Sequence, residues 1–123
     1  MSATVFNKTQ VIARNDIAIE ACNIAIAQLD GITGLGTDSD ARRLDEITRA
    51  ETLRNRLETI NENLTAASKV IQPLSAQLVT ELNDLGNKLD QQIRNDDLIN
   101  ASIDFISSVL NDVARLRNIT RQV

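Results

Sequence analysis

The stretch from Ala50 to Ile71 reads AETLRNRLETINENLTAASKVI, and apolar residues recur in it at steps of three and four. The members of this series are Ala50, Leu53, Leu57, Ile60, Leu64, Ala67 and Ile71. Such steps place side chains on one face of an α-helix, and their repetition over about three heptads is typical of a coiled-coil seam. Charged residues, mainly arginine and glutamate, lie between them and predict a solvated face. The stretch therefore predicts an amphipathic helix that packs against another helix.

The two ends of the chain carry broader apolar faces. In the first segment Ile12, Ile19 and Ile26 recur every seven residues, and Ile17 begins a second stripe beside them. The last segment also has two neighbouring stripes, and a face of this width predicts packing against more than one neighbour. The alternation typical of β-strands is absent. We expect helices at residues of roughly 9–30, 40–71, 73–94 and 97–120.

The expected helix ends determine how many helices the chain forms. The expected N-caps are Asn7 or Thr9, Ser39 or Asp40, and Asn95 to Asp97. Pro73 is the only proline, and it either turns the chain between two helices or kinks one bent rod over residues 40–93. We favour the turn. The prediction is an all-α fold in one domain of residues 1–123, an antiparallel bundle of three to four helices with coiled-coil-like heptad seams.

A glycine-rich stretch, GITGLGTDSD, follows the first helix and superficially resembles a phosphate loop. It contains no lysine and follows a helix, whereas a P-loop needs a lysine and follows a strand. Asp38 and Asp40 would repel a phosphate. We predict a turn in which Gly31 ends the first helix in the left-handed conformation. Ile32 and Leu35 either fold over the end of the bundle or contact a partner.

Composition excludes several kinds of chemistry. The chain has no histidine, which removes histidine catalysis and histidine metal ligation. Cys22 is the only cysteine, so no intramolecular disulfide is possible, and its place on an apolar face predicts a buried thiol. Pairs of carboxylates at helical spacing, such as Asp16 with Glu20, are interpreted as surface acids. We predict no catalytic residue, no cofactor and no metal.

The charge balance gives further exclusions. The net charge is −4, and only two residues are aromatic, both Phe. A nucleic-acid ligand is not expected, because the chain lacks a high pI and an aromatic stacking platform. The most apolar stretch, Ile17 to Ala27, is too short and too polar for a membrane span. No secretory signal is visible, so a cytoplasmic location is expected, with signal-independent export left open.

The arginines follow two patterns. Arg42, Arg49 and Arg56 are spaced by seven residues, and the acids that flank each of them predict a solvated face. The C-terminal segment carries several arginines close together. They are interpreted as cations that favour a helix C-terminus or as a contact with an acidic partner.

These patterns predict a non-enzymatic helical-bundle protein that acts through helix–helix contact with a protein partner or with itself. The candidate interaction residues are Ile32, Leu35, Leu53, Leu57, Ile60, Leu64, Arg115, Arg117 and Arg121. Two alternatives are a small acidic inhibitor or immunity-type protein that covers a basic partner, and a helical secretion-apparatus component. A fourth hypothesis is a bundle that holds a small ligand or metal between its helices, although no small-molecule ligand is predicted. Its polar groups would come from Asp16, Glu20, Asn23 and Asp104.

Overall fold

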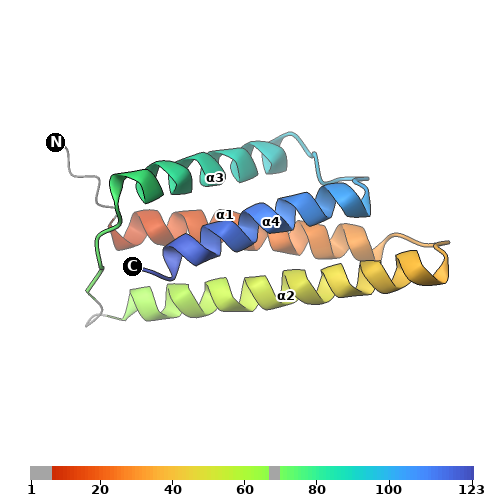
Figure 1. Cartoon of the computed structure of the whole chain (residues 1–123), viewed down its shortest axis with the longest axis horizontal. Helices are drawn as coiled ribbons and strands as arrows, with labels where there is room; N and C mark the ends of the chain where they lie inside the picture. The colour runs from red at the N-terminus through yellow and green to blue at the C-terminus, as the bar shows by residue number, and fades with distance from the viewer. Residues whose placement is uncertain (1–6, 67–69) are drawn as a thin grey trace.

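A computed structural model describes residues 7–66 and 70–123 of the chain. Over these two ranges it contains four α-helices and no β-strand (Figure 1). The helices are α1 (Lys8–Asp30), α2 (Thr37–Thr65), α3 (Ala76–Arg94) and α4 (Ile103–Thr120). The all-α prediction is therefore confirmed.

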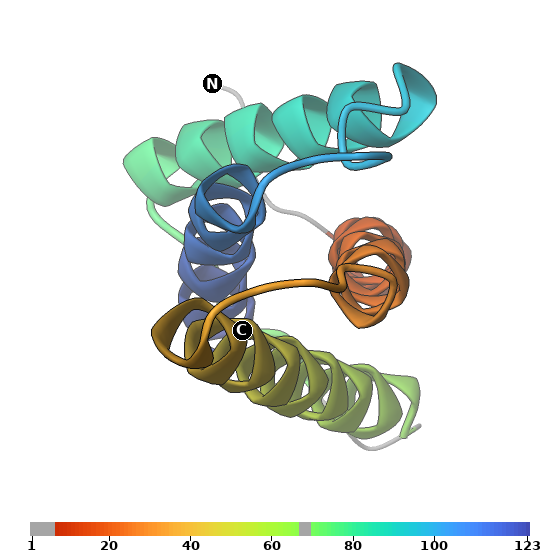
Figure 2. The same ribbon diagram turned by 90° about the vertical axis from the view of Figure 1, so that its right-hand side faces the viewer.

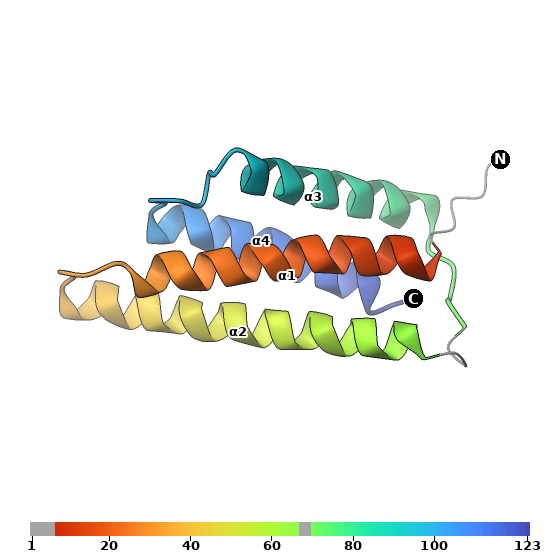
Figure 3. The same ribbon diagram turned by 180° about the vertical axis from the view of Figure 1, so that it is seen from behind.

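Helices α1 and α4 form the middle of the structure and contact each other. Helices α2 and α3 lie on opposite sides, and each contacts both α1 and α4 (Figure 2). Within the described ranges α2 and α3 make no contact with each other. Each helix runs opposite to the one before it, so α2 and α4 are neighbours that run in the same direction (Figures 1 and 3). The broad apolar faces predicted for the first and last helices are confirmed, because each of these helices packs against three others.

The buried seam of α1 consists mainly of small residues. Its fully buried positions advance by four and three residues and are Val11, Asn15, Ala18, Cys22, Ala25 and Leu29, with Ala21 beside them. The isoleucines at positions 12, 19 and 26, which form one of the two predicted stripes, are half-buried and pack against the core. Alanine and cysteine at the centre let the neighbouring helices approach closely.

The start of α2 differs from the prediction. The helix begins at Thr37 after Gly36, which is an N-cap without a side-chain hydrogen bond. Ser39 and Asp40 therefore lie inside the first turn, where the helix dipole favours the carboxylates of the segment. Gly31 does not adopt the left-handed conformation, since its φ is −80°. The left-handed glycine of this connection is Gly34, with φ of 76°.

Pro73 lies in the connection between α2 and α3, which confirms the predicted turn and rules out one rod over residues 40–93. The prediction that α2 reaches residue 71 was wrong, because the backbone is already extended at Ala66. This connection must lead from one side of the bundle to the other, which a continued helix would not allow. Helix α3 starts three residues later than expected, with the Ser75 hydroxyl accepting a hydrogen bond from the main-chain N–H of Leu78. Ala67 of the heptad series lies outside the described residues.

Helix α4 also begins later than predicted, at Ile103 instead of residue 97. Asp96 and Asn100 adopt positive φ angles of 57° and 62°, which turn the chain before the helix can start. The N-cap is Ser102, whose hydroxyl accepts a 3.1 Å hydrogen bond from the main-chain N–H of Phe105. The first helix keeps its predicted cap, Asn7, in a reciprocal capping box.

Candidate functional site

Arg42 and Arg49 form polar contacts between the parallel helices α2 and α4. Arg42 of α2 forms an ion pair with Asp104 of α4. Seven residues further along both helices, the Nη2 atom of Arg49 donates a 2.5 Å hydrogen bond to Oδ1 of Asn111. The same nitrogen lies 3.3 Å from the main-chain oxygen of Ser107. The arginine stripe of α2 therefore contacts α4, and two of its three members have acceptors there.

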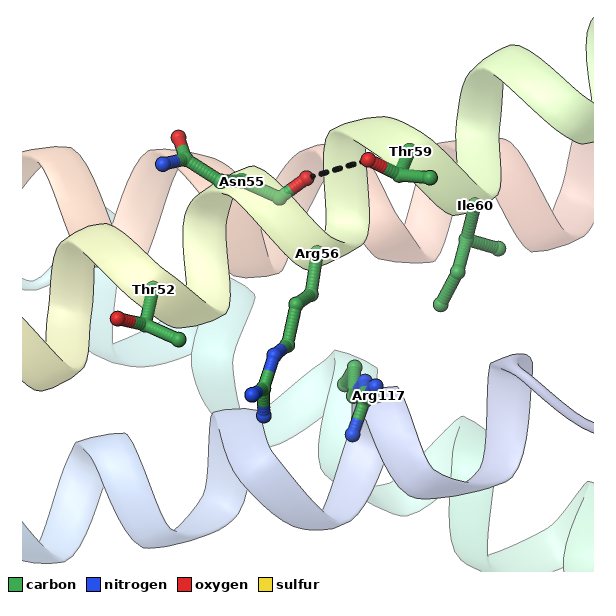
Figure 4. A pocket seen from close by; sticks show the side chains of 6 residues that line it. All are labelled: Thr52, Asn55, Arg56, Thr59, Ile60 and Arg117. Carbon is green, nitrogen blue, oxygen red and sulfur yellow. Dashed lines mark hydrogen bonds between the residues drawn. The ribbon is translucent and has the colours of Figure 1, made fainter.

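The third member of the stripe, Arg56, does not follow this pattern. Position 118, seven residues beyond Asn111, is another asparagine, but no hydrogen bond joins it to Arg56. Arg56 instead reaches toward α4 beside Arg117, and both side chains enter the space between the helices (Figure 4). This space is a shallow groove of about 400 Å³. Its lining residues are Thr52, Asn55, Arg56, Thr59, Ile60 and Arg117.

A smaller hollow of about 70 Å³ continues from this groove toward the end of α4. It shares Ile60 with the first hollow, and its other lining residues are Asn63, Leu64, Thr120, Arg121 and Val123. We call the two hollows together the α2–α4 groove. On α2 the groove extends from Thr52 to Leu64, a distance of about 18 Å at the rise of an α-helix. An extended peptide of about five residues has this length.

The described residues that line the groove include three arginines and no aspartate or glutamate. The side chains of Arg56, Arg117 and Arg121 form no ion pair or hydrogen bond with any residue that the structure describes. The Nε atom of Arg117 is buried and has no hydrogen-bond partner there. Burial lowers the pKa of Arg117 below its usual range, and repulsion from Arg56 and Arg121 lowers it further. The two stretches outside the described ranges contain no aspartate or glutamate that could pair with these arginines.

Arg115, two residues before Arg117, has a different role. Its Nη2 atom lies 2.7 Å from Oε1 of Glu81 on α3, and its Nε atom bonds the other carboxylate oxygen. This bidentate ion pair raises the pKa of Arg115 and lowers the pKa of Glu81. Of the three arginines predicted together, Arg115 therefore connects α4 to α3, and only Arg117 and Arg121 line the groove.

Most of the apolar residues predicted to contact a partner lie outside the α2–α4 groove. Leu53, Leu57 and Leu64 are buried in the core of the chain, so in this conformation they offer almost no surface to a partner. Ile60 lies in the α2–α4 groove. Ile32 is half-buried and packs against the core, which corresponds to the folded-over alternative for this residue. Leu35 is half-buried in the connection between α1 and α2.

The sequence analysis missed Arg56 and the polar residues Thr52, Asn55 and Thr59 as members of this site. The spacing of Arg42, Arg49 and Arg56 by seven residues could have indicated the site, because residues spaced in this way lie on one face of a helix and contact the same neighbouring helix. The sequence does not show that this helix is α4, or that its third contact brings two arginines together.

The residues proposed for a ligand or metal site do not converge. Asp16 accepts a 3.0 Å hydrogen bond from Asn61, whereas Asn23 accepts one of 3.2 Å from Arg54. Asp104 is engaged with α2 by its ion pair. In the described parts of the chain no three Asp, Glu or Cys side chains are grouped as a metal site requires.

The single thiol is placed away from the groove and held inactive. Cys22 is fully buried, as predicted, and burial raises its pKa to about 12. A thiol in this state is protonated at neutral pH and does not act as a nucleophile. The groove itself presents the guanidinium groups of Arg56, Arg117 and Arg121, which are hydrogen-bond donors suited to anions.

Among the described helices, none has the length and apolar character needed to cross a bilayer. Comparison of the chain with protein-family models, with curated proteins and with solved structures gives no match.

Proposed function

We propose that the protein is a non-enzymatic helical-bundle binding protein whose α2–α4 groove receives an acidic segment of a partner protein. The observation that carries the proposal is the gathering of Arg56, Arg117 and Arg121 in one groove without an ion pair to the described residues. Seven other cations of the chain are engaged in ion pairs. Unpaired cations along a groove favour an anionic occupant.

The chemistry of the groove suits a peptide. Arginine is enriched at protein interfaces because its planar fork binds carboxylates through two hydrogen bonds at once. Ile60, between the two hollows, adds an apolar contact for a side chain of the partner. This charge favours an acidic partner at the groove over the basic partner of the inhibitor alternative. The coiled-coil-like character of the seams, the oligomeric state and the cytoplasmic location stay predictions.

A peptide-binding assay tests the proposal. A short fluorescent glutamate-rich peptide is titrated with the full chain, beside the same peptide with glutamine at every glutamate position. We expect the glutamate peptide to bind and the glutamine peptide to bind at least about tenfold more weakly. Raising the salt concentration should weaken binding, because the arginines at the groove are partly exposed.

Two variants assign the binding to the groove. The double variant Arg56→Gln, Arg117→Gln should lose the binding of the glutamate peptide. The matched control is Arg94→Gln on α3, where the native arginine pairs with Asp90 at 2.9 Å, away from α2. Equal affinity of the double variant and the control for the peptide would refute the proposal.

A further inference from the structure

We infer that Arg56 and Arg117 form a binding site for a doubly charged phosphate group. This inference rests on the proposed function and names the chemical group that the groove recognises. It comes from the regular series of contacts between α2 and α4, whose third step differs from the first two.

At each of the first two steps the arginine of α2 finds an acceptor on α4. Arg42 has the carboxylate of Asp104, and Arg49 has the amide oxygen of Asn111. The third step combines Arg56 with a second arginine, and the described structure supplies no acceptor to either. The two guanidinium groups at this step carry a combined charge of +2, and no acidic side chain of the described structure pairs with either of them. A carboxylate supplies one negative charge, whereas a phosphate monoester supplies about 1.5 to 2 at neutral pH.

The donors present also fit a phosphate group. A guanidinium group binds phosphate oxygens through paired N–H donors, and two guanidinium groups offer several donors from two directions. The buried Nε of Arg117 is one such donor without an acceptor. When the half-buried side chain turns toward the groove, an oxygen of the ligand would accept this hydrogen bond and remove the penalty of an unpartnered buried donor.

The other polar residues of the groove are not directed at the space between Arg56 and Arg117. The hydroxyl of Thr59 donates to the main-chain oxygen of Asn55 at 3.0 Å, and the amide of Asn55 is turned away from the two arginines (Figure 4). Arg121 lies in the neighbouring hollow and contributes positive potential. We therefore assign recognition of the phosphate group to Arg56 and Arg117.

Nuclear magnetic resonance of the full chain tests the site with inorganic phosphate as the probe. The Nε–Hε signals of the arginines are followed while phosphate is added, with sodium chloride at matched ionic strength as the reference. We expect the signals of Arg56 and Arg117 to shift and saturate with phosphate only, and the signal of Arg94 to stay in place. In Arg117→Gln, the Arg56 shift should be lost or need at least about tenfold more phosphate. Equal shifts of all arginines, or no saturation, would overturn the inference.

Three peptides test whether the phosphate group belongs to a phosphorylated partner protein or to a small phosphate compound. They share one sequence and carry phosphoserine, glutamate or serine at a single position. We expect the phosphoserine peptide to bind about tenfold more tightly than the glutamate peptide. Equal affinities of these two peptides would overturn the phosphate inference and leave the proposed function intact. Saturable binding of inorganic phosphate without binding of any peptide would support the phosphate site, assign it to a small phosphate compound and refute the proposed function.

Discussion

Replacing Arg117 by methionine is expected to stabilise the protein while it abolishes binding at the α2–α4 groove. The native side chain buries its Nε atom without a hydrogen-bond partner in the described structure. Its charge is also desolvated and lies near Arg56 and Arg121. Methionine retains a flexible apolar stem that fills similar space, and it removes both the unpartnered donor and the charge. A residue whose removal stabilises the fold is typical of a binding site, where function and stability conflict.

The size of the effect follows from the burial of this one atom. An unpartnered buried donor costs about 1–3 kcal/mol. Part of that gain is lost, because the half-buried native side chain loses packing contacts when it is replaced. Repulsion from the two neighbouring arginines adds little at physiological salt, since both are exposed and screened. A net gain of about 1 kcal/mol in the free energy of unfolding corresponds to a rise of roughly 3–6 °C in Tm for a domain of this size.

Thermal and urea unfolding followed by circular dichroism measure this change. The matched control is Arg115→Met, two positions away on the same helix. Because Arg115 holds the bidentate ion pair with Glu81, that substitution should lower the unfolding midpoint. Opposite signs for the two variants are the expected result. If Arg117→Met lowers the midpoint as Arg115→Met does, Arg117 stabilises the fold and the reasoning is refuted.

Three further predictions concern the core. Leu57→Ala, at a fully buried position, should lower the free energy of unfolding in urea by about 2–5 kcal/mol, whereas Leu44→Ala, at a side chain 51% exposed, should change it by less than about 0.5 kcal/mol. Asn15→Leu should raise the urea midpoint, because Oδ1 of this buried side chain has no partner among the described residues. A lower midpoint would contradict this, because it would mean that the hydrogen bond from Asn15 to Asn61 stabilises the fold by more than the unpartnered Oδ1 destabilises it. The free energy of unfolding should fall as pH rises above 9.0, because the Cys22 thiol of the unfolded chain ionises there while the thiol of the folded chain stays protonated up to about pH 12. An equally steep decline in the variant Cys22→Ala would contradict the assignment of this pH dependence to Cys22.

The type and number of the helices could be predicted from periodicity, because each helix must bury one apolar face. The ends of the helices were harder to predict, since they depend on backbone angles that local composition does not determine. Asn95 to Asp97 resembles an N-cap, yet Asp96 and Asn100 turn the chain and Ser102 starts the helix instead. The heptad pattern likewise continues to Ile71, although the helix stops at Thr65 to let the chain cross the bundle.

The site was less predictable than the fold because it depends on which helices are neighbours. Periodicity shows that α2 has an arginine stripe and that α4 ends in several cations. It does not show that these helices lie parallel in a register that pairs Arg42 with Asp104. That register brings Arg56 to Arg117 and assigns Arg115 to α3, where Glu81 neutralises it. Sequence spacing alone therefore treats Arg115 and Arg117 alike, although the structure gives them different roles.

The most direct test of the central claim is to locate a bound anionic peptide on the protein. A spin label attached to the glutamate-rich peptide broadens the amide signals of protein residues near it. We predict broadening at Arg56, Thr59 and Arg117, which line the α2–α4 groove, and none at Asp90 on α3. Broadening centred on α3, or the absence of any localised broadening under saturating peptide, would contradict the assignment of the groove as the binding site.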